Sequence, residues 1–214
     1  MSVIRPFRAV RPRPDLAERV AALPYDVMSS DEARQMVEGN PYSFLHVDKA
    51  EIDLNPGINL YDPQVYQKAR ENLLQMMNEN VLQEDQQANL YIYRQIMNGR
   101  SQTGIVACCS IDEYLENKIK KHEHTRADKE QDRINHVNIC DANTGPIFLT
   151  YKNRSDINAI IDAWCQKSSV YNYQSEDGIE HIVWIIDDHS TMARLIELFK
   201  QVENLYIADG HHRC

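Results

Sequence analysis

Apolar residues with helical spacing alternate along the chain with short, strand-like apolar runs. Val65, Ala69, Leu73 and Met76 lie on one helical face, and Pro63 suits the first turn of a helix, so a helix is predicted from 63 to about 81. The same reasoning predicts helices over 15–23, 30–39, 128–140, 157–164 and 191–202.

Strands are predicted where short apolar runs end at turn residues, over 3–10, 43–47, 89–97, 102–110, 147–151, 179–186 and 205–208. Asn98-Gly99 between two such runs is a strong hairpin signal, and residues 176–178 predict a second hairpin. Residues 49–63 contain Pro56 and Gly57 and read as a loop. Hairpins in the middle and strand–helix alternation later predict a mixed α/β (α+β) protein, with a mixed sheet and flanking helices.

Composition narrows the class of protein. The chain has 214 residues, of which 43% are hydrophobic and 26% charged, and its net charge is −9. This balance is that of a globular protein, and the acidic excess argues against nucleic acid as a partner. No run approaches the roughly 20 apolar residues that span a bilayer, and the N-terminus lacks the pattern of a signal peptide.

The cysteines favour a reducing compartment. The chain has five, an odd number, without a CxxC pair, and Cys108 and Cys109 are adjacent in a strand-like run, where neighbours point to opposite faces. We therefore expect a cytoplasmic protein. Together with the composition, this leads us to expect a small-molecule substrate and no membrane partner. The oligomeric state stays open.

The segment Leu205–Arg213 ends in a candidate phosphate site. A strand that enters Gly210 and continues into a helix start would direct several backbone N–H groups at one point, and Arg213 adds a fork of donors suited to phosphate oxygens. A plain Asp-Gly turn with exposed His211 and His212 is the alternative.

A second candidate is the charged segment 120–126, KKHEHTR. His122 and His124 share a face if the segment is extended and could bind a metal, although the ligand set is incomplete. Glu123 could instead act as a general base, with Lys121 or Arg126 as an anion ligand. In a helix starting near Arg126, Lys129 and Arg133 would follow it along one face, and the plain alternative is a solvated charged surface.

Three shorter segments are weaker candidates. Pro24-Tyr25-Asp26 places a carboxylate at a rigid turn. Asn40-Pro41-Tyr42-Ser43 and His46-Val47-Asp48 could line a pocket, and residues 143–146 form a polar loop before a strand. Each is more simply a packed turn. Trp164 and Trp184 lie on apolar faces and are expected in the core.

The segments LPYDVMS, NPYSFLHVDKAEIDL, IKKHEHTRADKEQDR, NTGPIFLTY and LYIADGHHR occur in this order. Together they resemble a bacterial and archaeal family catalogued as a domain of unknown function, number ten-fifteen, over residues 4–213. The resemblance implies a longer protein, in which residues 1–214 form an N-terminal mixed α/β domain that stops at the start of a helix. A sub-boundary is expected near residue 85.

The DGHHR segment alone also resembles the nucleotide-phosphate turn of the ParB/sulfiredoxin superfamily, which includes a free-serine kinase, sulfiredoxin and a CTP-binding partition protein. His211 stands where sulfiredoxin has its catalytic cysteine, which argues against sulfinic acid repair. The resemblance implies that Gly210, His211, His212 and Arg213 hold phosphates, and that Asp209 orients the turn or binds a metal.

The general base and the other phosphate-contacting residues are assigned by extending this interpretation beyond the DGHHR segment. Glu123 or Asp26 would deprotonate an incoming hydroxyl, and Lys121, Thr125 and Arg126 would contact the nucleotide phosphates. The sequence thus predicts a phosphotransferase that uses ATP or ADP with Mg²⁺ on a small hydroxyl compound, for which free serine is a candidate. Two alternatives stay open: a nucleotide-binding regulatory module without turnover, and a metal-dependent phosphatase or other hydrolase.

Overall fold

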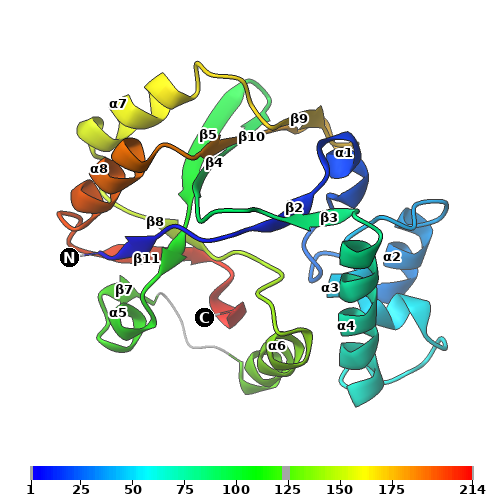
Figure 1. Ribbon diagram of the computed structural model, residues 1–214. Helices are drawn as coiled ribbons and strands as arrows, with labels where there is room; N and C mark the ends of the chain where they lie inside the picture. The colour runs from blue at the N-terminus through cyan, green and yellow to red at the C-terminus, as the bar shows by residue number, and fades with distance from the viewer. Residues whose placement is uncertain (1, 122–125, 214) are drawn as a thin grey trace. The chain divides into compact units, whose positions relative to one another are not determined.

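The structure is a computed structural model that describes residues 2–121 and 126–213 (Figure 1). The chain divides into two compact units. Unit 1 contains the described residues of 1–14, 84–123 and 148–209, and unit 2 contains those of 15–83, 124–147 and 210–214. The two units are described separately below.

Unit 1 is built around a four-stranded antiparallel sheet of order β5-β4-β10-β9. Its strands are β4 (Leu90–Met97), β5 (Arg100–Val106), β9 (Tyr171–Gln174) and β10 (Glu180–Ile186). Asn98 and Gly99 join β4 to β5 with φ of 52° and 75°, which is the left-handed backbone that this hairpin turn requires. Both predicted hairpins are confirmed.

Helices α7 (Ser155–Trp164) and α8 (His189–Phe199) lie side by side at this sheet (Figure 1). The indole of Trp164 donates a hydrogen bond to the Ile185 carbonyl of β10, and that of Trp184 donates to Lys167. Both tryptophans are buried, as predicted.

A second, mixed sheet of unit 1 has the order β7-β11-β8. Strand β11 (Leu205–Asp209) runs parallel to β7 (Ile119–Lys120) and antiparallel to β8 (Phe148–Thr150). The other elements of the unit are β1 (Ile4–Arg5), which pairs with β6 (Cys108–Cys109), β2 (Val10–Pro12) and α5 (Ile111–Leu115). The mixed α+β class is therefore confirmed.

Unit 2 is helical. Its elements are α1 (Ala17–Val20), α2 (Ser30–Met36), α3 (Leu45–Asp48), the 3-10 turn η2 (Ala50–Asp53), α4 (Pro63–Asn78), α6 (Ala127–Cys140) and the 3-10 turn η3 (His211–Arg213). The 3-10 turn η1 (Pro14–Leu16) and strand β3 (Leu82–Glu84) span the points where the chain passes between the units.

Helix α4 begins as predicted, because Asp62 caps the Gln64 N–H and Pro63 occupies the first turn. Its apolar face, with Val65, Ala69 and Leu73, packs in one core cluster with Val47 of α3 and Cys140 of α6.

Three predictions of local structure need correction. The strand expected over 43–47 is the helix α3, in which the Ser43 hydroxyl accepts from the Leu45 N–H and the chain continues into η2. An apolar run this short fits one helical turn as well as a strand, so packing decides. The loop expected over 49–63 accordingly contains η2, and the strand expected over 3–10 is divided between β1 and β2.

The His46–Asp53 pair gives unit 2 a pH-dependent contact. His46 Nδ1 lies 2.9 Å from Asp53 Oδ1, and Asn72 donates to Asp53 Oδ2 at 2.7 Å. The hydrogen bond with Asp53 raises the pKa of His46. Burial opposes ionisation of Asp53, but the hydrogen bonds from His46 and Asn72 lower its pKa overall.

We expect Asp53→Asn to lower the free energy of unfolding by about 1–2 kcal/mol at pH 5–6. The His46 contribution is complete below the ordinary pKa of 6.5 and is lost as the pH rises through the raised pKa. The Asp53 contribution is complete above 3.8 and is lost as the pH falls through the lowered pKa. Urea unfolding from pH 3 to 9 should therefore show the largest difference from wild type between about pH 4 and 6.5, and a constant difference would contradict this account.

Candidate anion-binding site

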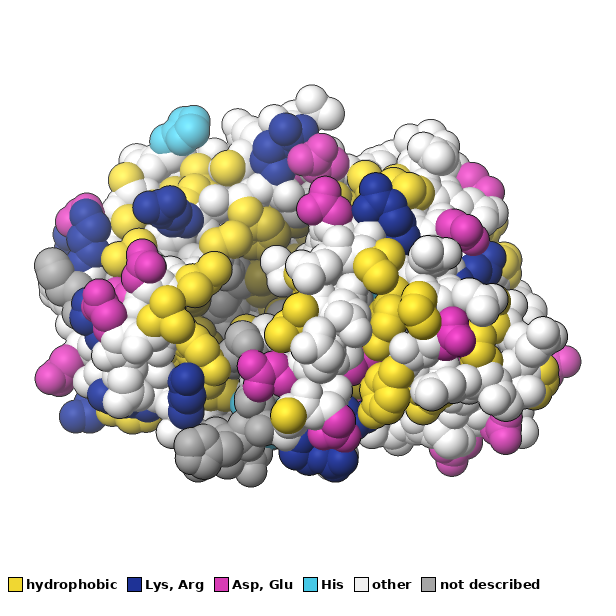
Figure 2. All heavy atoms as spheres, turned by 90° about the horizontal axis from the view of Figure 1, so that it is seen from below, with side chains coloured by type: hydrophobic (Ala, Val, Ile, Leu, Met, Phe, Trp, Pro, Cys, Tyr) yellow, Lys and Arg dark blue, Asp and Glu magenta, His cyan; other side chains and the backbone are white. Residues whose placement is uncertain are grey.

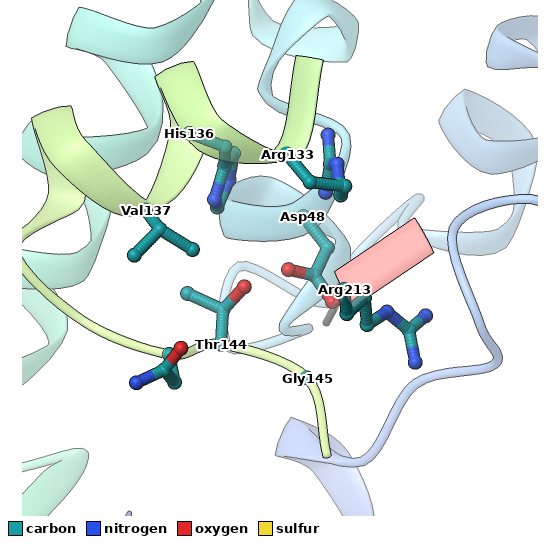
Figure 3. Close-up of a pocket in the computed structure, with 8 residues that line it drawn as sticks. Asp48, Arg133, His136, Val137, Thr144, Gly145 and Arg213 are labelled. Atoms are coloured by element: carbon teal, nitrogen blue, oxygen red, sulfur yellow. The ribbon is translucent and has the colours of Figure 1, made fainter. Parts of the chain in front are cut away.

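Unit 2 contains a small polar cavity of about 20 Å³ (Figure 3). Its wall includes Asp48 at the end of α3, Arg133 and His136 of α6, Thr144 and Gly145 of the following loop, and Arg213 of η3. This volume admits a single water-sized group. The cavity thus brings together three regions that are far apart in the sequence, at residues 48, 133–145 and 213.

Asp48 supplies a carboxylate with one unsatisfied oxygen. Its Oδ1 is buried and has no hydrogen-bond partner in the described part of the chain. The carboxylate points toward Thr144 (Figure 3), whose side chain forms a hydrogen bond with it. Burial raises the pKa of Asp48, although the Thr144 hydrogen bond and the positive charges of Arg133 and Arg213 oppose this rise. Asp48 is therefore suited to accept a proton.

His136 is held as a neutral imidazole. Its Nε2 lies 3.1 Å from the Val47 carbonyl oxygen, which can only accept, so Nε2 carries the ring hydrogen and Nδ1 keeps a lone pair. Burial lowers the pKa of His136, and Arg133 lowers it further. Cys140 Sγ lies 3.9 Å from the same Nε2, and burial raises the pKa of this thiol to about 11.

Arg133 is fixed by a buried ion pair. Its Nε and terminal nitrogen lie 3.0 and 2.8 Å from Asp132 Oδ2, while the Tyr66 hydroxyl of α4 donates to Asp132 Oδ1 at 2.9 Å. All three side chains are buried. The guanidinium plane lies over the ring of Tyr25, with Cζ 4.1 Å from the ring centroid.

Arg213 of η3 also lies in the wall of the cavity. Gly210 has a φ of 77°, and the Arg213 side chain then turns back so that Nη1 donates to the Pro146 carbonyl at 3.1 Å. The guanidinium lies against Gly145, where an added Cβ would be only 3.1 Å from Arg213 Nε. Its Cζ is 5.4 Å from the Tyr25 centroid.

Several predicted segments thus meet at this cavity. Arg213, the loop 143–146 and Asp48 were all candidates from the sequence, and the structure places them around one space. His211 and His212 are half-buried beside them in η3, with ring centroids 3.9 Å apart. Asp209, by contrast, is exposed at the end of β11 in unit 1, where it pairs with Phe148.

Other predicted site residues lie elsewhere. Asp26 is exposed, and Arg126 is an exposed residue before α6 that pairs with Asp128 at 2.8 Å. Lys121 belongs to unit 1, where its Nζ lies 3.8 Å from the Tyr114 centroid. The residues His122, Glu123, His124 and Thr125 lie outside the described ranges. Within those ranges no group of three His, Cys, Asp or Glu side chains could hold a metal ion.

The sequence interpretation missed Tyr25 and His136. His136 follows Arg133 by three residues, so the helical face predicted for Arg126, Lys129 and Arg133 could have been extended to it. Tyr25 was noted only as the neighbour of Asp26. A buried tyrosine beneath two arginines from distant segments has no local sequence signal.

The surface gives no sign of a large charged patch on the face drawn in Figure 2, where basic and acidic side chains are interspersed. Among the described residues, no helix has both the length and the apolar character needed to cross a membrane.

Fold and site together define a mixed α+β protein with a buried carboxylate and two arginines around a polar cavity. A family model described as Protein of unknown function (DUF1015) matches residues 4–214, and the chain belongs to this family. The predicted membership of this family is thereby confirmed. No curated protein and no solved structure matches the chain significantly.

Proposed function

We propose that the protein is a phosphotransferase, which transfers a phosphoryl group from a nucleotide to a small hydroxyl compound at the cavity of unit 2. The observation that carries the proposal is the convergence of Arg133, Arg213 and the unsatisfied Asp48 oxygen on one cavity. Phosphoryl transfer needs positioned cations for the phosphate oxygens and a base for the attacking hydroxyl.

The charge balance supports an anionic ligand. Asp132 neutralises Arg133, which leaves Arg213 and Asp48 as the remaining charged groups, with His136 neutral. When Asp48 takes up a proton from the acceptor hydroxyl, the site gains a net positive charge. That change favours the negative charge that develops on the transferred group.

Asp48 is the proposed general base. Its free Oδ1 is the acceptor that a hydroxyl entering the cavity would meet, and the raised pKa makes it a stronger base than an exposed aspartate. The sequence offered Asp26 or Glu123 as the general base, and we now assign this role to Asp48. Arg213 keeps its predicted role, and Gly210, His211 and His212 form the turn that presents it.

The cavity encloses only a water-sized group, so the hydroxyl would occupy it while the nucleotide phosphates meet the arginines at its mouth. Mg²⁺ commonly binds through one or two carboxylates together with substrate phosphates. Asp48 is the carboxylate in the cavity wall, but as the proposed base it must keep its oxygen free of the ion, so Mg²⁺ would be held by the nucleotide phosphates and water. When bound, the ion would neutralise charge on the phosphates.

Phosphorus NMR would test the proposal. The protein is incubated with Mg²⁺, ATP or ADP, and a panel of small hydroxyl compounds that includes free serine. We expect a phosphomonoester signal that requires one member of the panel and is lost in Arg213→Ala. Asp26→Asn, at the exposed candidate position, is the matched control and should transfer at the wild-type rate.

Nucleotide that stays intact with every acceptor would overturn the proposal. Binding without turnover would then identify a regulatory module instead, and phosphate released without any acceptor would identify a hydrolase.

A further inference from the structure

Gly145 lines the cavity at a position where the backbone itself would accept a side chain. Five of the seven glycines in the chain have a positive φ, which side chains rarely adopt, but Gly145 and Gly104 do not. Gly145 also precedes Pro146, and proline restricts the residue before it to extended backbone, which alanine can adopt. The reason for a glycine at position 145 therefore lies in what surrounds it.

The space beside Gly145 is filled by the Arg213 side chain (Figure 3). A Cβ added to Gly145 would lie 3.1 Å from Arg213 Nε, 3.2 Å from its Cζ and 3.3 Å from its Cδ, and these are the three atoms nearest to it. All three distances are shorter than the roughly 3.5–4.0 Å of an ordinary contact between heavy atoms. The guanidinium thus packs directly on the backbone of the loop.

Two further contacts keep the turn 210–213 on this loop. Arg213 Nη1 donates to the carbonyl of Pro146, the residue after Gly145, at 3.1 Å. At the start of the turn, a Cβ added to Gly210 would lie 3.4 Å from Ile147 Cα and 3.5 Å from the Pro146 carbonyl oxygen. The turn therefore lies against the loop 145–147 at both of its ends.

We infer that Gly145 is the positioning residue of Arg213: its missing Cβ lets the guanidinium lie on the loop, where it is held ready for the nucleotide phosphates. This inference rests on the proposed function and deepens it by assigning the residue that places the phosphate-binding arginine. An arginine that is already held in place loses less conformational freedom when it binds a ligand. A methyl group at position 145 would displace the guanidinium by a few tenths of an ångström, and displacing a positioned group weakens its interactions steeply.

The first measurement follows the guanidinium itself, without any ligand. In ¹H–¹⁵N spectra of the arginine side chains, the Nε–Hε signal of Arg213 is the one that is missing from Arg213→Ala. We expect this signal to shift in Gly145→Ala, because the added methyl group lies closest to Nε. Gly104→Ala is the matched control. A Cβ at position 104 has no atom within 4 Å, so this variant should leave the Arg213 signal in place.

The second measurement is binding of inorganic phosphate, by calorimetry at low salt. We expect Arg213→Ala to bind phosphate about 10- to 100-fold more weakly than wild type, the loss typical of a hydrogen bond to a charged group. Gly145→Ala, which keeps the arginine but displaces it, should bind about 3- to 10-fold more weakly. Adding Gly145→Ala to Arg213→Ala should cause no further loss, because the methyl group then has no guanidinium to displace. Gly104→Ala should bind like wild type.

The outcomes separate the role of Gly145 from catalysis. An Arg213 signal that stays unchanged in Gly145→Ala would contradict the contact. Wild-type protein that does not bind phosphate, or a Gly145→Ala loss that is equally large without Arg213, would overturn the positioning role. If the loss depends on Arg213 but no phosphate is transferred, Gly145 keeps its role and the phosphotransferase is rejected. If Gly145→Ala does not fold, adding Arg213→Ala should restore folding, and a double variant that stays unfolded would overturn the inference.

Discussion

Replacing Asp132 by alanine is expected to lower the free energy of unfolding by about 3–5 kcal/mol. The substitution leaves the buried guanidinium of Arg133 without its counter-ion, and it leaves the Tyr66 hydroxyl without an acceptor. An uncompensated buried charge costs far more than the ion pair itself contributes. Burial, together with the hydrogen bond to Asp132, raises the pKa of Tyr66 to about 12, so this phenol should titrate at lower pH in the variant.

Urea unfolding followed by circular dichroism would measure the loss. Asp128→Ala is the matched control, because Asp128 lies on the same helix and pairs with Arg126 at the surface. Exposed pairs contribute little, so this variant should unfold at the wild-type urea concentration. Equal midpoints for the Asp132 and Asp128 variants would mean that the buried network does not stabilise α6 against α4.

The second large effect is expected from Asp48→Asn. If Asp48 is the general base, asparagine cannot take the proton, and the rate of phosphoryl transfer should fall about 10²- to 10⁴-fold. The change is nearly isosteric, so loss of activity without loss of fold would separate the chemical role of Asp48 from a structural one. An Asp48→Asn protein that transfers phosphate at the wild-type rate would exclude Asp48 as the base.

The same substitution should not destabilise the protein at neutral pH. A carboxyl whose pKa is raised on folding binds its proton more tightly in the folded state, so ionisation weakens the fold. The loss in the free energy of unfolding begins as the pH rises above 3.8, the ordinary pKa of an aspartate, and it is complete above the raised pKa. The stability of Asp48→Asn relative to wild type should therefore increase with pH over this interval, which urea unfolding at several pH values would show. Residues of functional sites often reduce the stability of the folded protein in this way.

The sequence predicted the elements that carry their own local signals. Asn98-Gly99, the Asp62-Pro63 helix start and the apolar face of α4 each depend on residues close together in the chain, and each is confirmed. The strand predicted over 43–47 is wrong because its form depends on distant partners. The Asn72 side chain, for example, donates to the His46 carbonyl from α4.

The candidate site likewise contains some residues that the sequence could indicate and others that it could not. Arg213, Asp48 and the loop 143–146 could be proposed from residue type and turn chemistry. The pairing of Tyr25 with two arginines could not, because residues 25, 133 and 213 meet only in the folded unit. The unsatisfied oxygen of Asp48 is likewise a property of burial, which composition does not reveal.

The division of the chain into interleaved segments has a consequence for how the protein folds. Each unit is assembled from three separate stretches, and the Ser2 hydroxyl bonds to the Val202 carbonyl, 200 residues away. At about 5–20 residues per second, a ribosome needs roughly 10–40 s to make the chain between these two partners. Neither unit can complete its contacts during that time, and apolar surface of the N-terminal strand stays uncovered. Folding of both units should therefore wait until these C-terminal stretches have been made, and it should be slow and dependent on protection from aggregation.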